Sequence, residues 1–420
     1  MEAIIKKSEI EGKIIAPPSK SYTHRALICA ALAKGKSRII SPLISDDTEA
    51  TISVLRKLGI EIKMNEDSIE VEGGSLREPK EDLFCGESGT TMRLMTAICS
   101  LVNGKCKLTG GPSLSQRPIK PLIEGLKQLG INCSCNGQFP PVLVNGELND
   151  GVVEIPGNIS SQFISGLLLV APLAKQDVTI KLTTELESKS YVLMTIETQK
   201  KFGIEVEVSE DLRLFHVKNQ DYKPISIKVE GDWSSAAFLL TAGAMAGEVK
   251  VEGLNTKSLQ ADREIMRILE EMSAIIKTEN DLIVVKKSEL SSIEVDVSGH
   301  PDLFPILCVL TTTAKNKSII SGIKRLKIKE SDRVKAMKEG LIDMGVKIIE
   351  RNENISIESS IPKGAMIDPK NDHRIAMAFA ILGLVAEGET VIKDTECVSK
   401  SFPDFWDVMK KINAKVKMNE

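Results

Sequence analysis

The sequence has few aromatic residues and few histidines. Its 420 residues include two Trp, three Tyr, ten Phe and four His. Proteins that bind single-stranded nucleic acid stack the bases on aromatic side chains inside a basic groove. The formal net charge of −3 also provides no overall positive field for such a ligand. We therefore expect no nucleic acid partner.

Sequence motifs for metals and nucleotides are missing as well. The eight cysteines contain no Cys-x-x-Cys pair and the histidines form no tract, so no metal site is expected. There is no Gly-x-x-x-x-Gly-Lys-Ser/Thr loop, and no Gly-x-Gly-x-x-Gly follows a predicted strand. These absences argue against a nucleoside triphosphate or a dinucleotide as the driver of the chemistry. We expect the cysteines to be reduced core residues.

Long hydrophobic runs are absent too. The longest apolar run, 376–386, is far shorter than the ~20 residues that span a bilayer. The N-terminus alternates charged and apolar residues, unlike a signal sequence. These features predict a cytoplasmic protein with no membrane partner. The length predicts two domains, because one hydrophobic core rarely serves so long a chain.

One pattern recurs about every 70 residues. A β-like run is followed by a polar turn, an apolar helix, a short strand, a second polar turn, a second helix and a hairpin. The second helix closes on a glycine, a common left-handed cap, as in Leu58-Gly59-Ile60 and Met344-Gly345-Val346. The six units begin near Ile14, Leu83, Val152, Ile225, Val295 and Met366.

The repeat predicts an α/β fold of six βαβαββ units, three in each of two domains. We expect an inserted domain at 14–224. The other domain is discontinuous, formed by 1–13 and 225–420, because the N-terminal strand completes no unit of its own and must pair elsewhere.

Basic residues lie where the repeat predicts helix starts. Lys20, Arg25, Arg93 and Arg374 are examples. The Ser, Thr, Asp and Gly residues around them are common N-caps, which is the simplest explanation for any single helix start. A cation there opposes the helix dipole unless an anion compensates it. Equivalent helices in a repeat point the same way, so the joint pattern predicts an anionic ligand between the domains.

The segment 327–333 concentrates this feature, with five charges in seven residues. It follows an apolar alternation over 318–326 and precedes a helical pattern that starts at Val334, so it is interpreted as a strand-to-helix junction. A solvated helix start is the alternative.

Several short motifs resemble the enolpyruvyl transferase family, and the resemblance covers essentially the whole chain. The motifs are Pro18-Ser19-Lys20-Ser21 with Arg25, Gly89-Thr90-Thr91-Met92-Arg93, Arg117-Pro118-Ile119, Ser160-Ser161-Gln162, Lys329-Glu330-Ser331-Asp332-Arg333, Asp372-His373-Arg374 and Lys400-Ser401-Phe402-Pro403-Asp404.

This resemblance implies the two-domain enolpyruvyl transferase fold, and transfer of the enolpyruvyl group of phosphoenolpyruvate to the 5-hydroxyl of shikimate 3-phosphate. It implies no cofactor, and we expect a monomer. Three alternatives stay open: a sister transferase acting on a UDP-linked amino sugar, an RNA 3′-end cyclase, and a binding protein without turnover.

The resemblance also assigns residues to the two substrates. It places shikimate 3-phosphate against Lys20, Ser21, Arg25, Ser160, Ser161, Gln162, Ser188, Tyr191, Asp302 and Lys329. It places phosphoenolpyruvate against Lys20, Gly89, Arg117, Gln162, Lys329, Arg333, Arg374 and Lys400.

Three residues are expected to be catalytic: Asp302 as the base for the 5-hydroxyl, Glu330 as the proton carrier, and Lys20. Eight cations, including Arg93, are expected to repel one another in the empty protein and to hold it open. Gly89 favours inhibition by glyphosate, which occupies the phosphoenolpyruvate pocket in the family. Glu87, Leu94 and Arg325 depart from residues often found in the family.

Overall fold

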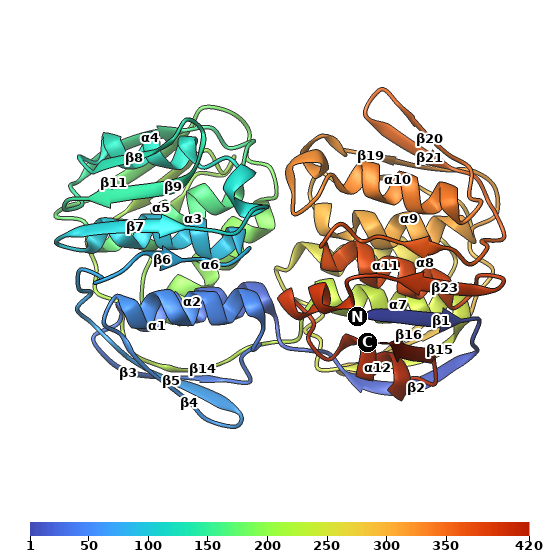
Figure 1. Ribbon diagram of the computed structural model, residues 1–420. Coiled ribbons are helices and arrows are strands. Elements are labelled where there is room, and N and C mark those ends of the chain that lie inside the picture. Colours follow the sequence, from blue (N-terminus) through green and yellow to red (C-terminus); the bar gives the residue numbers. More distant parts are fainter. Residues whose placement is uncertain (420) are drawn as a thin grey trace. The chain divides into compact units, whose positions relative to one another are not determined.

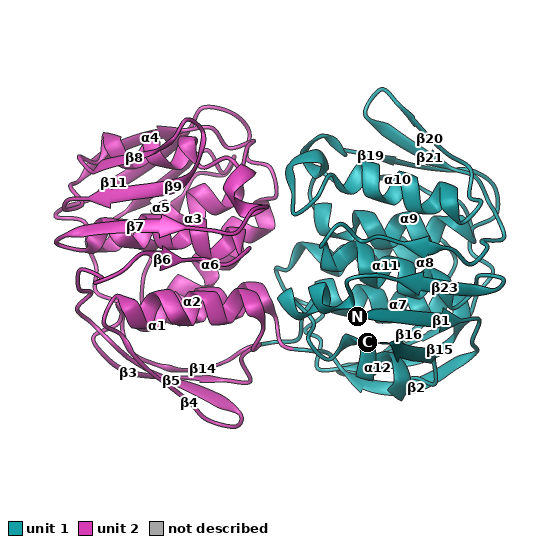
Figure 2. Cartoon of the chain, in the orientation of Figure 1, with its two compact units in different colours: residues 1–17, 230–420 teal, residues 18–229 magenta. Residues whose placement is uncertain are grey.

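A computed structural model describes residues 1–419. The chain forms two compact units: unit 1 comprises 1–17 and 230–420, and unit 2 comprises 18–229 (Figure 2). The predicted domain boundaries, 13/14 and 224/225, stay a prediction.

Unit 2 contains three four-stranded sheets. In each, the first strand runs parallel to the second, and the other neighbours are antiparallel. The strand orders are β14 (Ser226–Lys228), β3 (Gly35–Ile40), β5 (Ser68–Gly73), β4 (Glu61–Met64); β6 (Leu83–Phe84), β7 (Lys105–Thr109), β9 (Phe139–Asn145), β8 (Asn132–Asn136); and β10 (Gly151–Ile155), β11 (Val178–Leu182), β13 (Leu214–Val217), β12 (Glu207–Val208).

Unit 1 repeats this arrangement three times. Its sheets are β2 (Ile10–Ile15), β15 (Gly247–Glu252), β17 (Leu282–Lys286), β16 (Ile275–Glu279); β18 (Glu294–Asp296), β19 (Ser318–Ser321), β21 (Asn354–Ile357), β20 (Ile348–Arg351); and β22 (Met366–Ile367), β23 (Glu389–Ile392), β1 (Glu2–Lys6), β24 (Lys415–Asn419). The predicted α/β architecture of six repeats is therefore confirmed.

Two strands pair differently from the simple repeat. The sequence predicts that β2 opens the first unit and β14 the fourth, yet β2 pairs with β15 in unit 1 and β14 pairs with β3 in unit 2. Both occupy the same parallel edge position, so the exchange keeps the strand order of each sheet. The N-terminal strand β1 pairs with β23 and β24.

The helices of unit 2 are α1 (Lys20–Leu32), α2 (Asp46–Lys57), α3 (Gly89–Ile98), α4 (Lys120–Gln128), α5 (Ser161–Val170) and α6 (Lys189–Lys201). Those of unit 1 are α7 (Trp233–Ala246), α8 (Ile265–Glu271), α9 (Phe304–Thr312), α10 (Arg333–Asp343), α11 (His373–Gly383) and α12 (Phe405–Lys411) (Figure 1). Short 3-10 segments precede several of them, including η2 (Leu114–Gln116), η4 (Ala261–Glu264), η5 (Pro301–Leu303), η6 (Lys324–Ile328) and η7 (Thr395–Lys400). None of the helices in residues 1–419 has both the length and the apolar character needed to cross a membrane.

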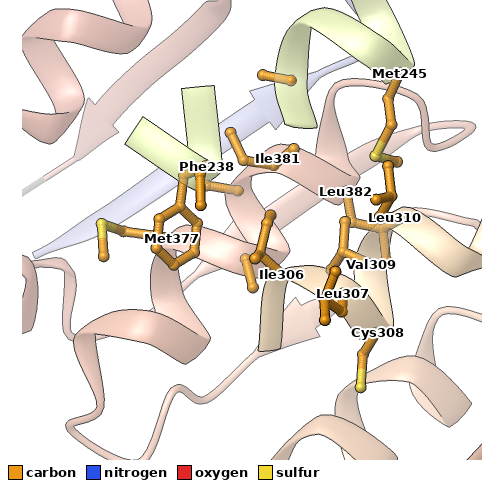
Figure 3. Close-up of a cluster of buried hydrophobic side chains, with 14 of the residues drawn as sticks. Phe238, Met245, Ile306, Leu307, Cys308, Val309, Leu310, Met377, Ile381 and Leu382 are labelled. Atoms are coloured by element: carbon orange, nitrogen blue, oxygen red, sulfur yellow. The ribbon is translucent and has the colours of Figure 1, made fainter. Parts of the chain in front are cut away.

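The first helix of each repeat forms the core of its unit. In unit 1, α7, α9 and α11 contact one another and are apolar on nearly every face, as expected for fully buried helices. Figure 3 shows Phe238, Leu310 and Met377 among their interlocking side chains. Because these helices are fixed by packing, their starts are held at defined positions.

The segment 318–333 differs from its predicted form. Strand β19 ends at Ser321, short of the expected residue 326, because Gly322 adopts a left-handed conformation (φ +74°) and η6 begins at Lys324. Helix α10 begins at Arg333, and the Asp332 carboxylate caps it by accepting from the Lys335 N–H (3.0 Å). The charged residues thus lie in a short irregular link at a helix start.

Leu310 is fully buried in the core of unit 1. Leu310→Ala should destabilise that unit by about 2–5 kcal/mol, because the substitution removes apolar contacts and leaves a cavity. Leu259 in the same unit is 37% exposed, so Leu259→Ala should change stability by no more than about 0.5 kcal/mol. Urea unfolding of both variants measures the difference, and equal shifts would contradict the assignment of the core.

Candidate active site

The predicted site residues of unit 1 form one ion cluster centred on Arg333. Its guanidinium is 1% exposed and donates to the Asp372 Oδ2 (2.8 Å), the Asp302 Oδ1 (2.8 Å) and the Glu330 Oε2 (2.8 Å). Arg374 Nη2 donates to the other oxygen of Asp302 (3.1 Å). Three segments that are distant in the sequence are therefore joined at the starts of α9, α10 and α11.

Lys329 and Lys400 extend this cluster. The Lys329 Nζ lies 3.9 Å from the Asp302 Oδ1, and the Lys400 Nζ donates to the Asn371 carbonyl (2.6 Å). Asp372 also caps α11 by accepting from the Arg374 N–H (3.0 Å). Asp372 was placed in a family motif from the sequence but was not predicted as a site residue.

Burial and charge within the cluster shift the pKa values of Asp302 and Lys329. Burial alone raises the pKa of Asp302, but the charges of Arg374, Lys329 and Arg333 outweigh it and hold this pKa well below its usual value. Burial lowers the pKa of Lys329 to about 8, against the opposing effect of Asp302. Asp302 is thus ionised at neutral pH, while Lys329 can exchange a proton near neutrality.

The cations of unit 1 are compensated by their neighbours. The sequence predicted repulsion among them in the empty protein, but Arg333 is paired with three carboxylates and Arg374 shares Asp302. These ion pairs offset the repulsion, which the prediction did not include because it counted only the basic residues. That the empty protein is held open stays a prediction.

In unit 2, the start of α1 is joined to α2 and α6. The Lys20 Nζ is 2.8 Å from the Asp47 Oδ2. The cap of α2 is Ser45, in a capping box with Thr48, and Asp47 lies in the first turn of that helix. Sequence reasoning therefore missed Asp47 as the partner of Lys20.

Arg25 is buried and bridges α1 to α6. It donates to the Ser21 carbonyl, the Tyr191 carbonyl and the Thr195 hydroxyl, each at 2.8 Å. Burial lowers its pKa to about 10, so it is charged at neutral pH. These bonds bring Ser21 and Tyr191 together. Ser188 caps α6 in a left-handed conformation (φ +52°), which is uncommon for a non-glycine residue.

Gln162 lies at the meeting of α5 and α3. Its Oε1 accepts from the Arg93 Nη1 (2.7 Å), and its Nε2 donates to the Thr90 hydroxyl (2.8 Å). Ser160 caps α5 by accepting from the Gln162 N–H (3.3 Å), and Ser161 is the first residue of that helix. Arg93 was predicted only as one of the cations, and here it also orients Gln162.

Gly89 leaves room for Arg117. A Cβ added to Gly89 would lie 2.6 Å from the Arg117 Nη1, which is a shorter distance than real Cβ atoms show to their neighbours. The guanidinium thus rests against the backbone at the start of α3. In unit 2 the predicted site residues thus lie in three groups, around Arg25, Gln162 and Gly89. Several of them lie at helix starts, which provide backbone N–H groups and positive dipole ends for anions. Among residues 1–419, no group of three or more His, Cys, Asp or Glu side chains is placed to hold a metal.

Asp262, in η4, is a buried carboxyl that the predicted site residues do not include. Its Oδ2 accepts from the Ser234 hydroxyl at the start of α7, and its Oδ1 has no hydrogen-bond partner. Burial and the neighbouring Asp302 raise its pKa to about 7, against the effect of Arg374.

Asp262→Asn should therefore change the pH dependence of stability. Because the pKa of Asp262 is higher in the folded protein than its ordinary value of 3.8, the protonated carboxyl stabilises the folded state at low pH. This contribution is complete below pH 3.8 and is lost as the pH rises towards 7. The stability of the variant relative to the wild type should increase across that window, by about 4 kcal/mol at most. Thermal unfolding at pH 4 to 8 measures it, with the exposed Asp343→Asn as control. A difference that does not vary with pH would contradict the shift.

Comparisons with known proteins agree on one family. Residues 4–409 match the family model described as EPSP synthase (3-phosphoshikimate 1-carboxyvinyltransferase). A 3-phosphoshikimate 1-carboxyvinyltransferase from Dehalococcoides mccartyi is 43% identical over 418 residues, which is 99% of each chain. One from Methanocorpusculum labreanum is 40% identical, again over 99% of each chain.

Solved structures show the same similarity. An EPSP synthase from Acinetobacter baumannii covers 100% of both chains with a TM-score of 0.86 and 27% identity. The enolpyruvyl transferase NikO from Streptomyces tendae has a TM-score of 0.79 and 15% identity, covers 99% of this chain and 98% of its own, and supports the fold alone.

Proposed function

The chain belongs to the EPSP synthase family, and we propose that it transfers the enolpyruvyl group of phosphoenolpyruvate to the 5-hydroxyl of shikimate 3-phosphate, releasing phosphate. The observation that carries this is the match to 3-phosphoshikimate 1-carboxyvinyltransferases along 99% of both chains. The family model spans residues 4–409, a range that contains the positions of all the predicted site residues.

The helix starts of unit 2 supply most of the proposed shikimate 3-phosphate site. We assign this substrate to Lys20, Ser21, Arg25, Ser160, Ser161, Gln162, Ser188 and Tyr191, with Asp302 and Lys329 from unit 1. The bonds of Arg25 to the Ser21 and Tyr191 carbonyls support the grouping, because they hold these three residues next to one another.

Phosphoenolpyruvate brings a phosphate and a carboxylate, which planar guanidinium groups bind in bidentate fashion. We assign it to Lys20, Gly89, Arg117, Gln162, Lys329, Arg333, Arg374 and Lys400. The close approach of Arg117 to Gly89 supports this, because the same guanidinium lies beside the free N–H groups that open α3. Inhibition by glyphosate at this site stays a prediction.

The proposed reaction is an addition followed by an elimination. Asp302, ionised and held by Arg333 and Arg374, accepts the proton of the 5-hydroxyl as the oxygen bonds to C2 of phosphoenolpyruvate. Glu330 donates a proton to C3, which becomes a methyl group, while Lys20 stabilises negative charge on the substrates. Glu330 then removes a methyl proton, and the C–O bond to phosphate breaks.

Phosphate release tests the proposal. The protein mixed with phosphoenolpyruvate and shikimate 3-phosphate should release phosphate and form the enolpyruvyl ether, without added metal. Release with UDP-N-acetylglucosamine and none with shikimate 3-phosphate would instead support the sister transferase. We further propose that the enzyme acts as a monomer in the cytoplasm, and gel filtration with and without substrates checks the oligomeric state.

Glu330→Gln should slow turnover by about 10²- to 10⁴-fold, because the amide cannot transfer the proton. Substrate affinity should change little, because Gln keeps an oxygen that can accept from Arg333. Steady-state kinetics measures both. Glu350→Gln in the same unit, which breaks only the pairs with Lys327 and Lys338, is the control. A large rise in KM with unchanged kcat would contradict the assigned role.

A further inference from the structure

Glu87 precedes α3 and is bonded to a different segment of unit 2. Its Oε2 accepts from the Leu114 N–H (2.8 Å), and its Oε1 accepts from the Ser113 N–H (3.4 Å). Both amides lie at the start of η2, where backbone N–H groups lack partners within the helix. The carboxylate therefore anchors the loop 110–116.

This loop leads directly into Arg117. The Arg117 N–H donates to the Leu114 carbonyl (3.0 Å), so the residue that Glu87 anchors also fixes the backbone of Arg117. The Arg117 guanidinium then returns to Gly89, two residues after Glu87. The contacts close a circuit from Glu87 through the loop to Arg117 and back to the start of α3.

Two further observations show that the segment before α3 and the 110–116 loop pack closely against each other. The Gly111 N–H donates to the Gly86 carbonyl (2.8 Å). A Cβ at Gly111 would lie 2.2 Å from the Glu87 Oε1, so only glycine leaves room for the carboxylate there. The fit between the two segments thus depends on the side chain of Glu87 and on its conformation.

We propose that Glu87 is a positioning residue: by holding the 110–116 loop, its carboxylate sets the place of the Arg117 guanidinium against Gly89, where phosphoenolpyruvate binds. This inference rests on the proposed function. It identifies Glu87 as a group that acts on the substrate through Arg117.

Glu87→Ala should raise KM for phosphoenolpyruvate about tenfold, the effect of losing charge-assisted hydrogen bonds to the loop. KM for shikimate 3-phosphate should change little, because its assigned residues lie on other segments. Glu87→Gln keeps one acceptor oxygen and should restore most of the affinity. The same Glu87→Ala change in an Arg117→Ala background should add little, because Glu87 acts through Arg117.

Hydrogen exchange provides a readout that does not depend on turnover. The amides of residues 113 and 114 should exchange faster in Glu87→Ala. Glu78→Ala is the matched control: Glu78 Oε1 accepts from the Lys105 N–H (2.9 Å) in the same unit and also lies against a glycine, Gly104. It should leave exchange at 113 and 114 and KM for phosphoenolpyruvate unchanged.

Unchanged exchange at 113 and 114, or faster exchange with an unchanged KM for phosphoenolpyruvate, would overturn the proposal. Equal rises in both KM values would overturn it as well, because they would indicate a general structural defect. Absence of phosphate release from the wild-type protein would overturn the proposed function, a result that is distinct from any of these.

Discussion

The unit 1 site depends on one buried guanidinium. Arg333 has its charge removed from water, and such a charge is tolerated only when it is paired and hydrogen-bonded. Asp302, Glu330 and Asp372 provide that compensation with charge-assisted bonds at 2.8 Å. Because a guanidinium is planar and its N–H directions are fixed, these carboxylates have little freedom to move apart. The two proposed catalytic carboxyls are consequently positioned by the same side chain.

The repeat explains how residues from three segments meet at Arg333. Each repeat places an apolar helix in the core, and the packing of α7, α9 and α11 fixes where those helices begin. Asp302, just before α9, accepts from Arg333 and Arg374, and Asp372 caps α11 while it accepts from Arg333. At the start of α7, Ser234 donates to Asp262. Unit 2 uses the same geometry with neutral and basic side chains, so Gln162 joins α5 to α3 and Arg25 joins α1 to α6. One architecture thus yields a cluster of opposite charges in one unit and a mainly basic set in the other.

Much of this was predictable from periodicity. The alternation of strands, the apolar helices and the glycine caps identified six βαβαββ repeats, because those patterns are local. The exchange of β2 and β14 could not be predicted, since both are short strands of similar character that fit equivalent edge positions. The ion pairs of Arg333 with Asp302 and Asp372 span 31 and 39 residues, and no local pattern specifies such partners. Glu87 showed only as an unusual residue, because its partners are backbone amides that the sequence does not distinguish.

Burial and neighbouring charges shift the pKa values of Lys329 and Asp302 by different balances. Burial favours the neutral form of each group, yet only Lys329 shifts that way, with a pKa of about 8. Asp302 stays ionised because three cations surround it. A bound anion adds negative charge near both groups, which raises the pKa of Lys329 and strengthens its positive charge. The same charge raises the pKa of Asp302 and makes it a better base. The cluster therefore keeps Asp302 ionised and lowers the pKa of Lys329 before any anion binds, and a bound anion would raise both pKa values.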